Sequence, residues 1–346
     1  MGRVVHILYP STGGTGTFLI NLREAENHHT HLIIAWGVEV GSSEFQDALK
    51  PEIIIHKKSG LDIKSWVKIY RALDNLSPDL ICLHSPTAWP AVYFYCYWKK
   101  IKYISLQHTP PGYESWTERI ADKLIAKTAS EIICFSDKLS EIWKKNQGGK
   151  KPIVIPHRIN ENWWKQAPIL KQKGLNTNII IGHHGRLIPR KRPEKLIELM
   201  LHLKEKNVRL EIVGEGPELN NLILLTQKHG LENQIIFKGE LHQIELREWI
   251  QGLDLWIGFS LSETVSIATL EAICCGIECW CSGYDTIQKY TIDIQSLALG
   301  EIAYRIINHN RNSAQGDELR KKMIADLSFK EWGEKWSSLL DNSIKN

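Results

Sequence analysis

The sequence predicts an α/β protein of two doubly wound domains, and three observations lead to this fold class. The chain has 346 residues, whereas a single hydrophobic core stops growing near ~250–300 residues. Short apolar, β-branched runs alternate with amphipathic stretches of helical length, which is typical of βαβ units and parallel sheets. This alternation stops at the polar segment 161–177, which contains Pro168 and Gly174, and then restarts. We therefore expect one domain on each side of a linker.

The first domain, residues 1–165, is expected to contain seven strands separated by helices. The clearest helix is 62–76, in which Trp66, Ile69 and Leu73 recur on one helical face. The predicted strands are 3–9, 31–36, 52–56, 79–84, 102–108, 131–135 and 153–155.

The second domain, residues 178–325, repeats this pattern, and residues 326–346 are expected to form a closing C-terminal helix. Within that helix Trp332, Trp336 and Leu340 lie on one apolar side. In doubly wound sheets ligands bind beyond the carboxyl ends of the strands, so two facing sheets place the expected site in the cleft between them. The predicted strands of this domain are 178–183, 208–213, 234–238, 254–259 and 278–281.

Charge and hydropathy exclude some classes of protein. The net charge of +4 is too small to indicate a nucleic-acid partner. Residues 1–165 hold 21 Lys and Arg against 16 Asp and Glu, which suits either an anionic membrane surface or an ordinary solvated face. No apolar run approaches the ~20 residues of a membrane span, and residues 3–9 are more typical of a strand than of a signal peptide. We expect a cytoplasmic location.

Seven cysteines, an odd number without a disulfide-like spacing, are typical of a reducing compartment. Cys274, Cys275, Cys279 and Cys281 form a cluster that could bind zinc. However, neither pair has the usual Cys-x2-Cys spacing and no histidine is near in sequence, which favours apolar packing instead. We expect no bound metal.

A glycine-rich segment, 11–17, follows directly after the first predicted strand. Gly13, Gly14 and Gly16 would let the backbone approach a ligand closely, and the next helix would offer its free N–H groups to a phosphate. The segment has no Gly-Lys-Ser/Thr and is therefore not a Walker loop. A tight turn without a ligand is the alternative.

Two cations stand in the corresponding loop of the second domain. Arg186 and Lys191 lie in the segment 182–193, which follows the first strand of that domain and precedes a helix. Two positive charges fixed above the end of a strand can neutralise a diphosphate. A solvated basic turn is the alternative.

Two glutamates flank the start of a later helix. Glu263 ends a loop, and Glu271 lies about one turn into the helix that follows. Carboxylates accept hydrogen bonds from vicinal hydroxyl groups, whereas helix-terminal N–H groups favour an anion. The N–H groups expected to face that anion belong to Val265, Ser266 and Ile267. A capped surface helix with incidental glutamates is the alternative.

The order of these motifs, with Val-Gly-x-Gly-Pro at 213–217 between them, resembles glycosyltransferase family 4. The resemblance implies the GT-B fold, in which two Rossmann-like domains face each other across a cleft. It also implies transfer of a sugar with retention of anomeric configuration and without a metal or other cofactor. The substrate would be a nucleoside diphosphate sugar.

The resemblance assigns roles residue by residue. In the second domain it places Arg186 and Lys191 on the donor diphosphate, Glu271 on the nucleotide ribose and Glu263 on the donor sugar hydroxyls. In the first domain, Gly14 matches a loop that closes on the phosphates and His108 a histidine near the donor sugar. His84 matches another strand-end position of that domain.

The sequence departs from the family at Glu263-Thr264-Val265-Ser266, where Glu-Gly-Phe-Gly is usual. The loss of both glycines restricts the backbone and could change how the amides meet the phosphate. Two other interpretations therefore stay open. One is a sugar-nucleotide epimerase or hydrolase on the same fold, and the other is a non-catalytic partner protein that retains the fold.

The first domain also suggests an acceptor. Residues 87–102 combine aromatic side chains with Lys99, Lys100 and Lys102, a composition typical of a membrane-interface surface. Packing of Val92, Tyr95 and Cys96 on the sheet would leave only some rings exposed. We expect a peripheral membrane enzyme that extends a glycan or lipid-linked acceptor in surface polysaccharide or lipopolysaccharide synthesis.

Overall fold

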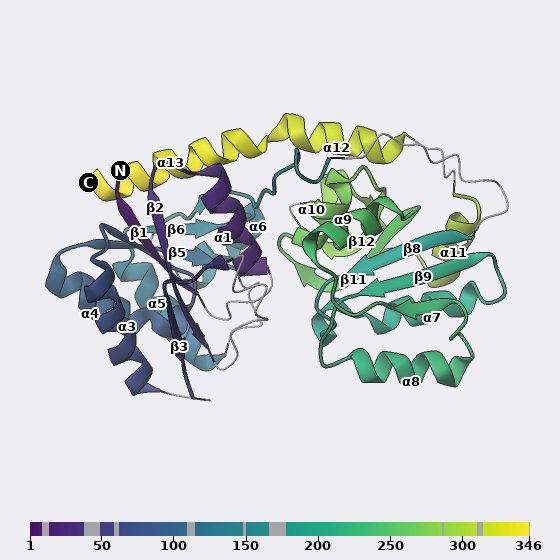
Figure 1. Cartoon of the computed structure of the whole chain (residues 1–346), viewed down its shortest axis with the longest axis horizontal. Helices are drawn as coiled ribbons and strands as arrows, with labels where there is room; N and C mark the ends of the chain where they lie inside the picture. Colours follow the sequence, from purple (N-terminus) through teal and green to yellow (C-terminus); the bar gives the residue numbers. More distant parts are fainter. Residues whose placement is uncertain are drawn as a thin grey trace. The chain divides into compact units, whose positions relative to one another are not determined.

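The computed structural model describes residues 1–8, 14–37, 49–58, 62–108, 115–147, 150–165, 178–285, 287–309 and 314–345. The chain divides into two compact units (Figure 1). Unit 1 comprises Met1–Ile159 and Phe329–Asn346, and unit 2 comprises Asn160–Ser328. The division at Ile159 precedes the polar segment 161–177, and the end of the chain returns to unit 1.

Unit 1 is built on seven parallel strands in the order β3-β2-β1-β4-β5-β6-β7. Every strand that the sequence predicts for this unit is present, with ends that agree within one residue, although Tyr9 lies outside the described residues. The strands are β1 Arg3–Leu8, β2 Thr30–Gly37, β3 Ile53–His56, β4 Leu80–Leu83, β5 Lys102–Gln107, β6 Glu131–Cys134 and β7 Ile153–Val154.

One face of this sheet is covered by α3 (Ile63–Leu76), α4 (Trp89–Lys99), α5 (Trp116–Thr128) and α6 (Asp137–Gln147), with the short helix η1 (Pro86–Ala88) before α4. The predicted helix 62–76 is confirmed as α3, except that Asp62 caps it by accepting a hydrogen bond from the Ser65 N–H. Alternate strand residues, such as Val5, Ile7 and Ile81, point into this apolar layer.

The opposite face is covered by α1 (Gly14–Ala25) and α13 (Phe329–Lys345), which lie side by side in Figure 1. The predicted amphipathic closing helix is confirmed as α13, because Trp332, Trp336 and Leu340 are fully buried. Both tryptophan rings meet Phe18 of α1 edge to face, at 5.8 and 5.5 Å between centroids. The last helix of the chain is therefore part of the core of unit 1.

Unit 2 is built on six parallel strands in the order β10-β9-β8-β11-β12-β13. All five predicted strands are present, and β11 continues four residues further than predicted, to Glu263. The sixth, β13, is only two residues long and was not predicted. The strands are β8 Ile179–His184, β9 Val208–Val213, β10 Ile235–Phe237, β11 Leu255–Glu263, β12 Cys279–Tyr284 and β13 Ile292–Asp293.

The helices of unit 2 follow the strands in alternation and complete the second doubly wound domain. They are η2 Pro189–Lys191, α7 Glu194–His202, α8 Leu219–His229, α9 Gln243–Gln251, α10 Ile267–Cys274, η3 Gln288–Tyr290, α11 Leu299–Ile307 and α12 Gln315–Asp326. Across the described parts of both units, no helix is long and apolar enough to cross a membrane.

The four clustered cysteines are buried and form no disulfide. Burial raises the pKa of the Cys275 thiol to about 12, so the thiol stays protonated at neutral pH. Within the described residues, no three His, Cys, Asp or Glu side chains are grouped so that they could hold a metal ion.

Candidate functional site

The loops that follow β8 and β9 run against each other backbone to backbone. The Gly185 N–H donates to the Val213 carbonyl at 3.0 Å, and the Leu187 N–H donates to the Glu215 carbonyl at 2.8 Å. Gly214 has a φ of 118°, and a Cβ there would lie 2.3 Å from the Gly185 carbonyl oxygen. The glycines of Val-Gly-x-Gly-Pro thus hold the cation-bearing loop in place.

Lys191 stands at the end of η2 with its ammonium 3.9 Å from Glu263 Oε2. The NH1 atom of Arg190 lies at the same distance from that oxygen and donates to the Ser262 carbonyl at 2.9 Å. All three charged side chains are largely buried. Among the described residues, Glu263 Oε2 accepts no hydrogen bond, so a ligand hydroxyl could still reach it.

Gly185 makes room for this cluster, because a Cβ at its φ of 134° would lie 3.2 Å from the Lys191 ammonium. Arg186 is the next residue, and its side chain is exposed. The surrounding protein lowers the pKa of Arg186, mainly by desolvation and then by the charge of Arg190, while Glu263 opposes the shift. The structure therefore brings Lys191 and Glu263 together as the sequence suggested, and adds Arg190.

The start of α10 departs from the family motif without strain. Ser266 is the N-cap, and its hydroxyl accepts from the Thr269 N–H at 3.2 Å. Its φ is −90°, and neither Thr264 nor Val265 has a positive φ. This backbone therefore does not need the glycines that the family carries here. The first N–H groups of α10, including that of Ile267, remain at a helix N-terminus, where anions are favoured.

Glu271, in α10, is held by a buried pair of side chains from β8 and β11. Its Oε2 lies 2.9 Å from His184 Nε2, and His184 Nδ1 accepts from the indole N–H of Trp256 at 2.9 Å. Because the indole can only donate, His184 Nδ1 must be unprotonated, so its Nε2–H donates to the carboxylate. Trp256 therefore fixes the tautomer of His184, and His184 orients Glu271.

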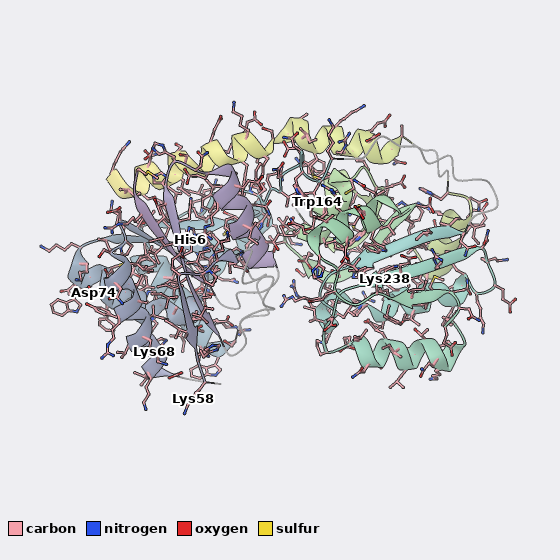
Figure 2. All side chains as sticks on the ribbon, viewed as in Figure 1. His6, Lys58, Lys68, Asp74, Trp164 and Lys238 are labelled. Carbon is pink, nitrogen blue, oxygen red and sulfur yellow. The ribbon has the colours of Figure 1, made fainter. Side chains whose placement is uncertain are left out.

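A second carboxylate network lies beside this one. Glu211 of β9 is buried, and its Oε2 accepts from the Trp249 indole at 2.7 Å. Arg209 and Lys238 pair with the same carboxylate at 3.0 and 3.5 Å (Lys238 is labelled in Figure 2). The Trp249 ring meets His184 edge to face at 5.8 Å between centroids, so the two networks support each other.

The remaining predicted site residues, Gly14 and His108, lie in unit 1. Gly14 is the first residue of α1, and the preceding glycine-rich residues 11–13 fall outside the described part of the chain. His108 follows β5, and its Nε2 lies 2.8 Å from Nδ1 of His84, which follows β4. Desolvation lowers the pKa of the half-buried His108 to about 3, so its ring is neutral at neutral pH.

Comparison with known families decides what this arrangement of two parallel-sheet units is. The model described as Glycosyltransferase Family 4 matches residues 12–163, and the model described as Glycosyl transferases group 1 matches residues 166–295. The chain belongs to glycosyltransferase family 4. The motifs that suggested this family, from Gly14 to Glu271, lie within the two matched regions.

Solved glycosyltransferases confirm the GT-B fold. HepE of Anabaena, solved with UDP and glucose, superposes with a TM-score of 0.83 at 18% identity and covers 99% of this chain and 100% of its own. TarM of S. aureus, solved with fondaparinux, α-GlcNAc-glycerol and UDP, has a TM-score of 0.79 at 14% identity and covers both chains fully.

A curated relative is the phosphatidylinositol N-acetylglucosaminyltransferase of Arabidopsis thaliana, of which one component matches this chain. The two are 24% identical over 183 residues, which is 51% of this chain and 40% of the relative. The chain thus matches less than half of that relative's length.

Three residues of this family 4 site were not predicted: Arg190, His184 and Trp256. The signal for His184 was present, because it ends the first strand of the second domain, where ligands of such sheets bind. Nothing in the sequence pairs it with Trp256, which lies 72 residues further along the chain.

Proposed function

We propose that the chain transfers a sugar from a nucleoside diphosphate sugar to a hydroxyl group of a glycan or lipid-linked acceptor, with retention of anomeric configuration. The observation that carries the proposal is the presence of Lys191, Glu263 and the N-terminus of α10 at the carboxyl edge of one sheet, with Glu271 held by His184. Cations and helix N–H groups suit phosphates, and carboxylates suit sugar and ribose hydroxyls.

The chemistry follows from where charge develops. Cleavage of the sugar–phosphate bond leaves an oxocarbenium-like sugar and a diphosphate of rising negative charge. We assign Lys191, Arg186 and the N–H groups of Val265, Ser266 and Ile267 to that diphosphate. Retention then needs no protein nucleophile, because the departing phosphate oxygen can take the proton of the attacking hydroxyl on the same face of the sugar.

Uracil is the base to test first, because HepE and TarM were both solved with UDP. The acceptor is less constrained. The Arabidopsis relative is named for transfer to phosphatidylinositol, and TarM was solved with glycans. A lipid-linked precursor of a surface polysaccharide or lipopolysaccharide is the acceptor that we propose.

A membrane-facing surface supports the lipid-linked acceptor. On α4, Val92, Tyr95 and Cys96 are buried, whereas Phe94, Tyr97 and Trp98 are 55, 67 and 70% exposed. Neighbouring α5 adds exposed apolar side chains, Trp116 at 74% and Ile120 at 52%. Lysines from both helices border these rings. Aromatic and basic side chains together are typical of proteins that rest on an anionic membrane.

Acceptor-dependent turnover tests the proposed function. UDP-sugars are incubated with and without phosphatidylinositol, polyprenyl-linked oligosaccharides or octyl glycosides, and the released UDP and the anomer of the product are measured. We expect UDP release to require an acceptor, to survive EDTA and to give the anomer of the donor. Release or rearrangement of sugar at the same rate without any acceptor would indicate the hydrolase or epimerase instead.

A further inference from the structure

Four histidines lie on the face of the unit 1 sheet that α1 and α13 cover. They come from four strands that are neighbours in the sheet: His31 from β2, His6 from β1, His84 after β4 and His108 after β5. Residues adjacent to them in sequence, such as Val5, Ile7 and Leu83, belong to the apolar core of the other face. Strand alternation therefore gathers all four imidazoles in one layer.

The strand register places these histidines on a diagonal. His31 pairs with Val4, and His6 lies two residues beyond Val4. His6 pairs with Cys82, and His84 lies two residues beyond Cys82. His84 follows Leu83, which pairs with Ser105, so His108 lies two residues beyond the position level with His84. Each step crosses one strand and rises toward the carboxyl edge, where ligands of such sheets bind.

The imidazoles are joined by hydrogen bonds along this diagonal. His31 Nδ1 lies 2.8 Å from His6 Nε2, His6 Nδ1 lies 3.0 Å from His84 Nε2, and His84 Nδ1 lies 2.8 Å from His108 Nε2. His6, His31 and His84 are buried, whereas His108 is half-buried. The row thus links the interior of unit 1 to a residue that the family places beside the donor sugar.

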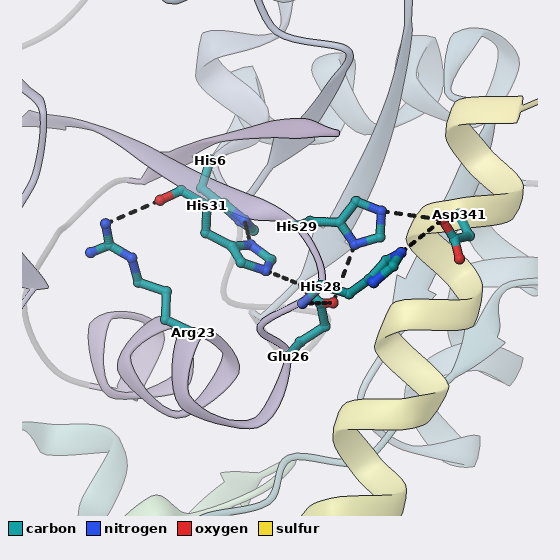
Figure 3. Close-up of polar contacts among 7 residues, drawn as sticks. All are labelled: His6, Arg23, Glu26, His28, His29, His31 and Asp341. Carbon is teal, nitrogen blue, oxygen red and sulfur yellow. Dashed lines mark hydrogen bonds and ion pairs between the residues drawn. The ribbon is translucent and has the colours of Figure 1, made fainter. Parts of the chain in front are cut away.

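The buried end of the row is anchored on Glu26. Its Oε2 lies 2.5 Å from His31 Nε2, while its Oε1 accepts from the His28 backbone N–H at 3.0 Å and lies 3.2 Å from His29 Nδ1 (Figure 3). Burial raises the pKa of Glu26, but the hydrogen bonds from His31 and His29 outweigh it and bring the pKa to about 2. Glu26 is therefore ionised and can only accept.

An ionised anchor gives the whole row one direction. A neutral imidazole has one N–H donor and one acceptor nitrogen. His31 Nε2–H donates to Glu26, so His31 Nδ1 must accept from His6 Nε2–H. The same argument then passes to His84 and to His108. Burial lowers the pKa of His6 and His84 well below the usual range, which agrees with a row of neutral rings.

We infer that Glu26, acting through His31, His6 and His84, holds His108 as the Nε2–H tautomer and leaves His108 Nδ1 as a hydrogen-bond acceptor. In this tautomer His108 can accept a hydrogen bond from a hydroxyl group of the bound sugar, and it cannot donate one through that nitrogen. His31, His6 and His84 are positioning residues in this scheme. The sugar as ligand rests on the proposed function, whereas the tautomer does not.

The groups packed around the row do not supply a competing partner. Arg23 of α1 donates to the backbone carbonyl of His31 at 3.0 Å and pairs with Glu52, which leaves the His31 ring nitrogens to the row (Figure 3). Phe18 and Phe135 pack against His108 at 5.6 and 4.6 Å between ring centroids. His157, near His108 and beside Arg158, has its pKa lowered well below the usual range by burial.

Nuclear magnetic resonance of the full chain labelled with ¹⁵N-histidine tests the tautomer directly. The His108 signals are identified by their loss in His108→Gln. We expect long-range ¹H–¹⁵N spectra to show a protonated Nε2 and an unprotonated Nδ1 for His108. A protonated Nδ1 in the wild-type chain would overturn the inference, and this measurement needs no variant that could fail to fold.

Glu26→Gln tests the anchor. An amide can donate as well as accept, so the row loses its fixed direction and both His108 tautomers become populated. The control is Asp341→Asn, since Asp341 lies 3.4 Å from His29 and outside the row. We expect the control to keep the wild-type spectrum. A wild-type His108 spectrum in Glu26→Gln would contradict the anchor.

Turnover gives an independent readout. We expect Glu26→Gln to lower kcat/KM roughly 10–100-fold, as loss of a second-layer hydrogen bond commonly does, and Asp341→Asn to leave it unchanged. Binding of UDP alone should be equal in all three proteins. Equal turnover in wild type and Glu26→Gln would show that the tautomer has no part in the reaction. If no variant turned over any donor while the spectra behaved as expected, the proposed function would fail and the tautomer assignment would stand.

Discussion

Lys191 combines a positive charge, a largely buried position and an anionic neighbour, Glu263, within 3.9 Å. Such a fixed cation is worth most where negative charge develops during the reaction. We expect Lys191→Ala to lower turnover roughly 10²–10³-fold while the fold persists. Lys195→Ala is the matched control, because Lys195 pairs with Glu198 on α7 outside the site. Near wild-type turnover of Lys191→Ala would remove the diphosphate assignment.

Trp256 provides a second residue-level prediction. Trp256→Phe keeps an aromatic ring but removes the N–H that fixes the tautomer of His184, and Glu271 then loses part of its orientation. One hydrogen bond contributes about 0.5–1.5 kcal/mol, so we expect the Kd for UDP to rise roughly two- to tenfold.

The control for Trp256→Phe is Trp280→Phe. Trp280 is also buried and donates its indole N–H to a carboxylate, Glu278, at 2.5 Å, but it lies outside the site. Calorimetric titration compares the two variants. An equal rise in Kd for both would assign the effect to general loosening of unit 2.

Among elements, α13 depends on one small residue. A Cβ on Gly333 would lie 2.3 Å from the Ala25 carbonyl oxygen at the end of α1. An alanine inside a helix normally stabilises it by about 1 kcal/mol relative to glycine, but overpacking typically costs about 1–3 kcal/mol. We expect Gly333→Ala to lower the melting temperature and Ser338→Ala, on the exposed side of α13, to leave it equal or higher. A melting temperature raised by Gly333→Ala would contradict this packing.

The sequence predicted elements well where a single periodicity was sufficient. Apolar runs with β-branched residues located twelve of the strands, and the spacing of Trp332 and Trp336 identified the buried side of α13. It failed where three-dimensional pairing decides. The two residues of β13 carry no period, and the irregular register of β11 after Phe259 hides its extension to Glu263.

The histidine row shows the same limit more sharply. His6 was not a candidate, and His84 was included only through the family resemblance. These residues are separated by 78 positions in the sequence, and only the strand order β2-β1-β4-β5 brings them together. Hydrogen bonding between distant strands leaves no local signal in the sequence.

For the whole molecule, buried neutral histidines predict acid sensitivity. Burial lowers the pKa of His6, His84, His157, His108 and His183, the last two to about 3. The unfolded chain binds protons at these groups near pH 6.5, whereas the folded chain does not, so folding stability falls as the pH drops from 7 toward 5. Each group contributes up to about 1.4 kcal/mol per pH unit.

Glu26 acts in the same direction at lower pH, because its pKa falls from 4.5 in the unfolded chain to about 2 in the folded one. Its contribution is present above pH 4.5 and is lost as the pH falls toward 2. Melting temperatures measured by calorimetry at pH 7, 6 and 5 check the histidine part of the prediction. A melting temperature that stays constant over this range would contradict burial of neutral histidines.

The proposed membrane-facing surface is tested on the whole chain. We expect sedimentation with anionic liposomes at low salt, release at high salt, and loss of binding in Lys99/Lys100/Lys102→Glu, because each lysine near such a surface contributes about 1 kcal/mol. Reversal of three exposed lysines of unit 2, Lys204, Lys206 and Lys228, is the control. Equal sedimentation of both triple variants would show that this basic, aromatic patch is only a solvated face.

The most direct measurement is the thermal shift of the full chain with UDP, GDP, ADP and TDP. A ligand present at 100 times its Kd stabilises the folded state by about 2.7 kcal/mol, which is readily measured as a rise in melting temperature. We predict that one nucleotide, with UDP the first candidate, raises the melting temperature of the wild-type chain and of Lys195→Ala but raises that of Lys191→Ala less. If none of the four nucleotides shifted the wild-type melting temperature at millimolar concentration, the donor site assigned to unit 2 would be wrong.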